Sequence, residues 1–261
     1  MLDAAQRAEA ADLLWAARRD RTPVSPLTDG YPGIDVVDAY EIQLTNIRRQ
    51  VAQGATVRGH KVGLSSEAMQ QMMGVDEPDY GHLLSDMELS EDVPVPAADY
   101  CFPRVEVEAG FVLGAALPGE GCTPADVLAA TEYVVPAIEL IDSRIKDWRI
   151  ALPDTVADNA SSAGLVLGAA RVRPADLDLT DVPAVLRRGG REVARGNTRA
   201  VLGDPTNAVA WLARKVAAFG VRLEAGQVVL PGSCTRAIDV RPGDVFQAEF
   251  GGLGSVSVTF Q

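Results

Sequence analysis

The spacing of apolar residues changes at about residue 56, and this change limits the folds that are open to the chain. Before it, apolar residues recur at helical spacing from Tyr40 to Val51, and Gly54 follows as a helix stop. After it come short apolar or alternating runs separated by glycine and proline, such as "GQVVLPG", "GDVFQAEF" and "GSVSVTF". We therefore predict an α+β fold, with a small helical part at residues 1–55 and a mostly β domain at residues 56–261.

Two helices and a hairpin are expected within the β part. The segment "TPADVLAATEYV" begins with Thr123 as N-cap and Pro124 at the first helical position, and "DPTNAVAWLARKVAAFG" begins in the same way with Asp204 and Pro205. The segment "GGLG" (251–254) separates two apolar runs and predicts a hairpin loop.

Composition excludes several classes of partner. The net charge is −12 and there is no basic run of the kind that binds a phosphate backbone, so nucleic acid is not expected as a partner. No apolar stretch has the length of a membrane span, and the N-terminal residues are too charged for a signal peptide. The 3 cysteines have no paired spacing, which indicates reduced thiols and a cytoplasmic location.

Three carboxylates interrupt the apolar strands. Glu106 and Glu108 lie in "CFPRVEVEAGFVLG" and share one strand face roughly 7 Å apart, because side chains alternate with period two. Glu139 lies in the apolar run from Val134 to Ile141. Two interpretations stay open. In one, the three oxygen donors bind a hard divalent cation such as Mg²⁺ or Mn²⁺. In the other, Glu106 and Glu108 line a solvated strand face and pair with arginines such as Arg104.

A lysine between two glycines is the candidate acid/base residue. Lys61 lies in "RGHKVGL", and a lysine near carboxylates can donate or accept a proton or neutralise a developing enolate. Asp79, in "DEPDYGHL", is its expected partner. The alternative is a surface lysine, the commoner fate of this residue type. We assign no role to His60.

Two further segments carry hydroxyl and amide groups. In "DNASSAGLVLG", Asn159 and Ser161 precede a strand, and such groups suit a substrate carboxylate or a tight turn equally well. In "LPGSCTRAI", Ser233 follows a strand and a glycine, where backbone amides and a hydroxyl can form an anion nest.

Taken in order, seven segments of the chain resemble the 2-keto-4-pentenoate hydratases of the fumarylacetoacetate hydrolase superfamily. They are "GHKVGL", "DYGHLL", "RVEVEAGFVLG", "AIELIDSRIKDW", "DNASSAG", "VLPGSCTRA" and "RPGDVFQAEFGGLGSVSVTF". The resemblance implies a mixed β-roll core with an N-terminal helical part. It implies one divalent metal, Mg²⁺ or Mn²⁺, and a homo-oligomer, such as a pentamer or decamer.

The resemblance also implies roles for single residues. The metal ligands would be Glu106, Glu108 and Glu139. Lys61 and Asp79 would be catalytic. The residues at the substrate's carboxylate end would be Asn159, Ser161 and Ser233. The roles of Arg144 and Arg236 stay open.

The implied activity is the hydration of a 2-hydroxy-2,4-dienoate, through its 2-oxo-3-enoate form, to a 4-hydroxy-2-oxo acid in aromatic or steroid ring catabolism. Two alternatives remain. One is a decarboxylase of the 4-oxalocrotonate type, and the other is a non-enzymatic protein with a structural cation site. Hydratases and decarboxylases of this kind form complexes with each other, so a neighbouring pathway enzyme is a possible partner.

Overall fold

The structure, a computed structural model, describes residues 1–66, 69–71 and 74–261. Its helices, apart from short 3₁₀ turns, are α1 (Ala4–Asp20), α2 (Leu27–Gly30), α3 (Val36–Ala52), α5 (Pro124–Ala130), α6 (Leu152–Ala157) and α7 (Pro205–Ala217). Its strands are β1 (Val57–Gly63), β2 (Asp79–Leu84), β3 (Arg104–Leu113), β4 (Thr131–Ile141), β5 (Ser162–Leu167), β6 (Pro183–Arg188), β7 (Arg191–Asn197), β8 (Val228–Leu230), β9 (Ile238–Asp239), β10 (Val245–Phe250) and β11 (Gly254–Thr259).

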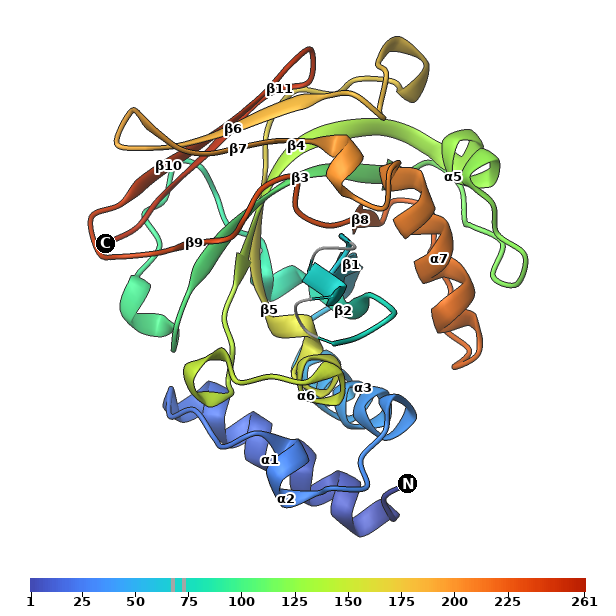
Figure 1. Ribbon diagram of the computed structural model, residues 1–261, viewed down its shortest axis with the longest axis vertical. Coiled ribbons are helices and arrows are strands. Elements are labelled where there is room, and N and C mark those ends of the chain that lie inside the picture. Colours follow the sequence, from blue (N-terminus) through green and yellow to red (C-terminus); the bar gives the residue numbers. More distant parts are fainter. Residues whose placement is uncertain (67–68, 72–73) are drawn as a thin grey trace.

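The strands form two sheets. The larger has the order β2-β1-β8-β3-β4-β5, with β9 added beside β3, and the smaller has the order β11-β10-β6-β7. Only the β1–β8 pairing is parallel among the strands that the structure describes. Figure 1 shows the smaller sheet lying against β3 and β4, while α1, α2, α3 and α6 gather at the opposite end of the molecule. The predicted α+β fold with a mixed β core is confirmed.

Alternation along β3 separates the core from the candidate site. Val105, Val107, Ala109 and Phe111 are buried in the main core, which also contains apolar residues of β10 and β11. Glu106 and Glu108 occupy the positions between these residues, so their side chains lie on the opposite face of β3. The apolar pattern therefore fixes the direction in which Glu106 and Glu108 point.

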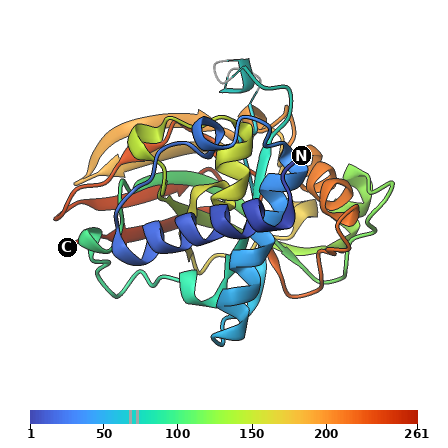
Figure 2. The same ribbon diagram turned by 90° about the horizontal axis from the view of Figure 1, so that it is seen from below.

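The N-terminal helices are built as their sequence predicts. Asp3 and Asp35 form capping boxes at the starts of α1 and α3, and Gly54 follows α3 with a φ of 106°. Apolar residues of both helices belong to the same core as the sheets. Figure 2 shows α1 and α3 lying across this end of the molecule. None of the described helices is both long and apolar enough to cross a bilayer.

One helix is shorter than predicted. The segment 123–134 was expected to be helical throughout, but α5 ends at Ala130 and β4 begins at Thr131. The β-branched and aromatic residues from Thr131 onward favour a strand, and pairing with β3 stabilises it. The hairpin at residues 251–254 and the helix that begins after Asp204 are found as predicted.

Candidate metal centre and active site

Strand register brings the three glutamates together. Glu106 and Glu108 share one face of β3, and Glu139 of β4 is the direct cross-strand partner of Glu106. Each glutamate has a carboxylate oxygen within 4.8 Å of one on the others. In the described part of the chain, this is the one group of three or more potential metal ligands.

The cluster is strained electrostatically. Glu108 and Glu139 are fully buried, and Glu106 is partly buried. Burial raises the pKa of Glu106 to about 7, and Glu139 adds to this effect although Lys61 opposes it. Burial also raises the pKa of Glu108 well above its usual range, with the charges of Glu139 and Glu106 adding to it. Without a cation, the cluster therefore retains protons at neutral pH.

The oxygen atoms of the cluster fit a hard metal ion. Glu108 Oε2 accepts a hydrogen bond from the Gly232 amide at 2.7 Å. Glu108 Oε1 and both carboxylate oxygens of Glu139 are buried without a hydrogen-bond partner. Buried polar atoms are nearly always paired, so carboxylate oxygens that lie this close together without hydrogen-bond partners among the described residues fit a divalent cation. The alternative of a solvated face paired with arginines is excluded for Glu108 by its complete burial.

Lys61 of β1 lies in the same cluster. Its Nζ is 3.5 Å from Glu139 Oε2 and donates to the Ala160 carbonyl at 3.0 Å. The side chain is 3% exposed, so the surface alternative is wrong. Burial lowers the pKa of Lys61, but the surrounding carboxylates, with Glu139 first and Asp79 second, more than offset this and raise it. Lys61 is therefore an ammonium ion held among carboxylates.

Asp79 of β2 reaches the same place from the neighbouring strand. Asp79 is the cross-strand partner of Gly63. A Cβ on Gly63 would lie 2.2 Å from Asp79 Oδ1 and 3.1 Å from Lys61 Nζ, so the two charged groups converge over this glycine. Asp79 Oδ2 accepts a hydrogen bond from Thr155 Oγ1 at 2.6 Å, whereas Oδ1 is buried without a partner. Thr155 of α6 thus orients Asp79, a contact between distant segments that no sequence motif indicates.

A left-handed turn at residues 159–161 lies next to Lys61. Residues Asn159, Ala160 and Ser161 have φ values of 54°, 48° and 57°. The Asn159 side chain accepts from the His82 amide at 2.7 Å and donates to the His82 carbonyl at 2.9 Å. These bonds hold the turn on β2 and direct the Ala160 carbonyl at Lys61. The Asn159 amide group is thereby engaged with the main chain, whereas the buried Ser161 hydroxyl has no partner.

A cleft of about 650 Å³ leads to the cluster. Glu106 and Ser233 line it, and the Ser233 hydroxyl accepts from the Val107 amide at 3.1 Å. Arg236 also lines the cleft. Of the predicted site residues, the structure therefore groups the three glutamates, Lys61 and Asp79, and it places Ser233 at the cleft.

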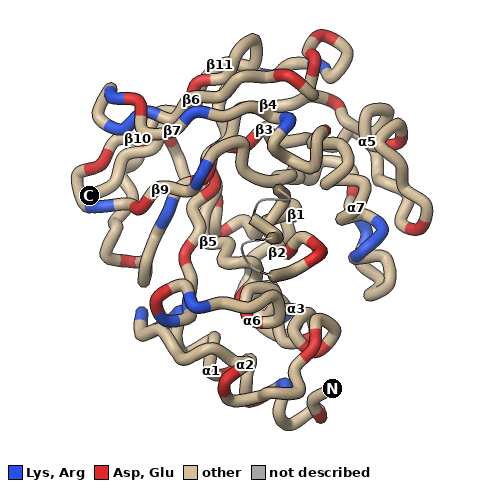
Figure 3. The backbone as a smooth tube through the Cα atoms, in the orientation of Figure 1, with Lys and Arg blue, Asp and Glu red and all other residues tan. Residues whose placement is uncertain are grey.

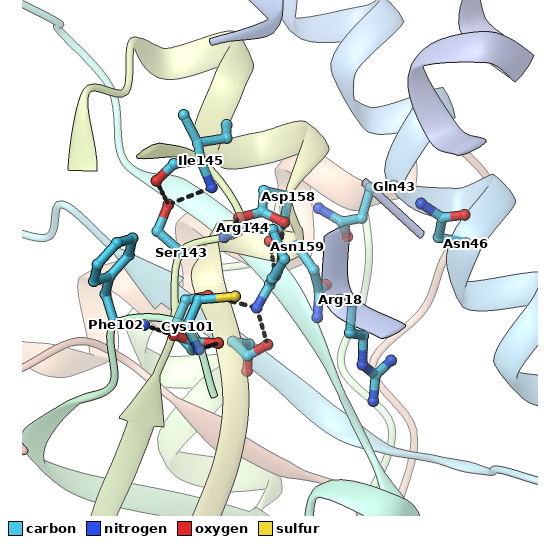
Figure 4. Close-up of polar contacts among 12 residues, drawn as sticks. Arg18, Gln43, Asn46, Cys101, Phe102, Ser143, Arg144, Ile145, Asp158 and Asn159 are labelled. Atoms are coloured by element: carbon cyan, nitrogen blue, oxygen red, sulfur yellow. Dashed lines mark hydrogen bonds and ion pairs between the residues drawn. The ribbon is translucent and has the colours of Figure 1, made fainter. Parts of the chain in front are cut away.

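Arg144 lies outside this cleft, in a buried polar network. Its Nε donates to Asp158 Oδ1 at 2.5 Å, and its Nη1 donates to the Asp142 carbonyl at 2.5 Å. Figure 4 shows this network beside Cys101 and Asn159. His60 packs against His82 with ring centroids 4.7 Å apart, and burial lowers the pKa of both rings. Both histidines are therefore uncharged parts of the interior.

Comparison with known proteins decides the family. Residues 76–261 match the family model described as fumarylacetoacetate (FAA) hydrolase C-terminal. The chain is 46% identical over 256 residues to the 2-keto-4-pentenoate hydratase of Paraburkholderia xenovorans (strain LB400), covering 98% of this chain and 95% of that protein. The chain belongs to the 2-keto-4-pentenoate hydratase family. The resemblance drawn from the seven sequence segments is confirmed, and membership of this family of hydro-lyases makes the chain an enzyme.

Other similar proteins have related names. The chain is 43% identical to the 2-oxo-hept-4-ene-1,7-dioate hydratase of Escherichia coli, over 96% of each chain. The solved structure of 4-oxalocrotonate decarboxylase from Pseudomonas putida G7, complexed with magnesium and adipate, has a TM-score of 0.97 and 34% identity. The match covers 100% of this chain and 99% of the decarboxylase chain. This chain and the decarboxylase therefore share one fold over their full length.

Proposed function

We propose that the chain catalyses the metal-dependent hydration of a 2-hydroxy-2,4-dienoate to a 4-hydroxy-2-oxo acid in the degradation of aromatic compounds. The observation that carries this proposal is the convergence of three glutamates with unpaired oxygens and a buried lysine at one cleft. Hydratase names among relatives over 40% identical support it.

Glu106, Glu108 and Glu139 would hold one divalent ion, Mg²⁺ or Mn²⁺. Carboxylate oxygens are the donors that such ions prefer, and solved structures of similar fold carry magnesium or manganese in their descriptions. When bound, the ion supplies electrostatic stabilisation of the negative charge that develops on the substrate's oxygen at C2.

Lys61 and Asp79 would move the protons. In the first step the 2-hydroxyl group loses its proton and C5 gains one, which gives the 2-oxo-3-enoate. In the second, water adds at C4 and C3 gains a proton. Lys61 is charged and lies at the cluster, so it is placed to donate a proton. Asp79, with Oδ1 unpaired, is placed to take one up. The Ser161 and Ser233 hydroxyls would bind the substrate's carboxylate end, and Asn159 would support the turn that carries Ser161.

The test is a product analysis. Purified protein with Mg²⁺ or Mn²⁺ is incubated with 2-hydroxypenta-2,4-dienoate, and the loss of the dienol's ultraviolet absorbance is followed. The expected product is 4-hydroxy-2-oxopentanoate. An unchanged dienol in the presence of either metal would contradict the proposal.

A decarboxylase is the second candidate, favoured by the likeness to 4-oxalocrotonate decarboxylase over the full length of both chains. Decarboxylation uses the same stabilisation of negative charge on the oxygen at C2, so the carboxylates and Lys61 do not distinguish the two reactions. Release of CO₂ from 4-oxalocrotonate, without hydration of the monoacid dienol, would favour this candidate.

We propose a cytoplasmic homo-oligomer larger than a dimer, a pentamer or decamer, that acts with or beside a neighbouring pathway enzyme. The family likeness supports the oligomer, and the three free cysteines support the cytoplasmic location. Exposed apolar side chains such as Phe102 and Leu128 are available for contacts between subunits. A monomer by light scattering at working concentration would contradict it.

A further inference from the structure

The charge of the cleft lining is opposite to that of the chain as a whole. The chain has 24 basic and 36 acidic residues. Among the residues that the structure describes, the cleft, in contrast, has one acidic residue in its lining, Glu106, which belongs to the carboxylate cluster. Its basic lining residues are Arg104, Arg195, Arg199 and Arg236. An arginine-rich cleft in an acidic protein concentrates anions at its mouth.

The fold brings β7, which carries Arg195, against the loop that follows β8, which carries Arg236. A Cβ on Gly196 of β7 would lie 1.7 Å from the Cys234 carbonyl oxygen, so the approach of β7 to this loop requires glycine. The Leu202 amide donates to the Ser65 carbonyl at 2.9 Å, which ties the segment after β7 to the segment after β1. Figure 3 shows basic positions around β7 and β9 on this side of the molecule.

The partners of the arginines single out one of them. Arg104, Arg195 and Arg199 each pair with a carboxylate, those of Asp239, Glu192 and Asp181. Arg236 has no carboxylate partner within the described residues, and its Nη2 donates to the Val193 carbonyl at 2.9 Å. That bond holds the guanidinium against β7 and leaves its charge uncompensated.

The cleft is also larger than a five-carbon substrate requires. Its volume of about 650 Å³ lies in the range that accommodates much larger ligands. Leu64, Ala200 and Ala237 contribute apolar surface to the lining of the cleft. The lining thus suits a hydrocarbon chain that ends in an anion.

We infer that the outer part of the cleft is a subsite for a second carboxylate, and that the substrate is a 2-hydroxy-2,4-dienoate with an acidic tail bound by Arg236. This inference rests on the proposed function. The carboxylate next to C2 would lie at the glutamate cluster, and the far carboxylate would accept hydrogen bonds from the Arg236 guanidinium.

The test compares three substrates with Mg²⁺ present. They are 2-hydroxyhepta-2,4-diene-1,7-dioate, the uncharged-tail 2-hydroxyhepta-2,4-dienoate, and the short 2-hydroxypenta-2,4-dienoate. We expect the highest kcat/KM for the dioate. Arg236→Gln should lower kcat/KM for the dioate about tenfold, mainly through KM, and change the other two less than about twofold. Arg236→Lys should restore part of the loss, and higher salt should reduce the dioate's advantage.

The matched control is Arg173→Gln, because Arg173 is exposed, pairs with Asp176 and does not line the cleft. Arg173→Gln should leave kcat/KM for all three substrates unchanged. If kcat/KM for the uncharged-tail dienoate equals that for the dioate, the carboxylate subsite is contradicted but the proposed function is not. An equal loss for all three substrates in Arg236→Gln would also overturn the subsite. No turnover of any of the three would overturn the proposed function, and the subsite with it.

Discussion

The glutamate cluster on β3 and β4 and the ion pair between Arg144 and Asp158 are both buried, yet their polar atoms are paired very differently. Arg144 donates from its main-chain amide and from all three guanidinium nitrogens, to Asp158 and to neighbouring carbonyls. Asp142 beside it accepts from the amides of Cys101 and Phe102. In the glutamate cluster, by contrast, three of the four buried oxygens of Glu108 and Glu139 have no hydrogen-bond partner among the described residues.

This difference separates charges that hold the fold from charges available to a ligand. A fully paired buried network contributes to a single native arrangement, and removing one member leaves the others unpaired. An incompletely paired cluster destabilises the metal-free fold, and in the proposed function a bound divalent cation would offset this cost. Substitutions in the first network should therefore act on stability, and substitutions at the second should act on metal binding and turnover.

The largest effect is expected at Lys61. Lys61→Ala should lower kcat by about 10²–10⁴-fold, because it removes the ammonium that, in the proposed mechanism, donates a proton and opposes negative charge on the substrate. Metal binding by calorimetry should persist, since the three carboxylates remain. The exposed Lys146 supplies the control, and Lys146→Ala should leave turnover unchanged. Near-normal turnover in Lys61→Ala would show that Lys61 has no catalytic role.

Arg144 should show the opposite behaviour. Arg144→Leu leaves the Asp158 carboxylate buried without its partner, and it should lower the free energy of unfolding by about 3–5 kcal/mol. Arg149→Leu is the control, because Arg149 and its partner Asp29 are both exposed, and its effect should stay below about 0.5 kcal/mol. Denaturant unfolding measures both. Equal stability of the two variants would contradict a structural role for Arg144.

Ionisation of Glu106 should make the stability of the metal-free protein depend on pH. Its pKa in the folded metal-free protein is about 7, above the ordinary 4.5. The stability that depends on its proton is therefore fully present below pH 4.5 and is lost as the pH rises through about 7. With a chelator present, unfolding free energy should fall by on the order of 2 kcal/mol over this range.

The Glu106→Gln variant tests this assignment because its side chain cannot ionise. Its metal-free stability should change less with pH, and its affinity for Mg²⁺ or Mn²⁺ should fall about 10²-fold, with similar losses for Gln at Glu108 and Glu139. Isothermal titration and thermal unfolding at several pH values provide both measurements. If all three variants bind the metal with wild-type affinity, the three glutamates are not its ligands.

The sequence predicted most of the cluster, because strand alternation acts over two residues. Glu106 and Glu108 interrupt an apolar run on one face, and that pattern needs no tertiary information. Glu139 was grouped with them because it interrupts another apolar run, but the register of β3 and β4 that places it opposite Glu106 could not be predicted from the sequence. The predicted helix at 123–134 was too long because strand pairing outweighed the helical spacing after Ala130.

Contacts made by backbone geometry or by distant segments could not be predicted. The left-handed turn at Asn159 uses an asparagine, an alanine and a serine, and neither the alanine nor the serine signals a positive φ. It turns the Asn159 side chain toward the His82 main chain, so a residue expected at the substrate has a role in positioning the turn. Thr155 lies 76 residues from Asp79 and has no motif of its own.

The smallest effect expected is at Thr155, which belongs to neither kind of charge cluster but orients a member of one. Thr155→Val keeps the shape of the side chain and removes the hydroxyl that donates to Asp79 Oδ2 at 2.6 Å. Asp79 then has both oxygens free to turn away from Lys61, and kcat should fall roughly 5–10-fold with KM little changed. Thr155→Ser retains the donor and should keep near-normal kcat, which separates the hydrogen bond from packing. If the valine and serine variants lose kcat equally, or if the valine variant changes only the melting temperature, Thr155 has no part in positioning Asp79.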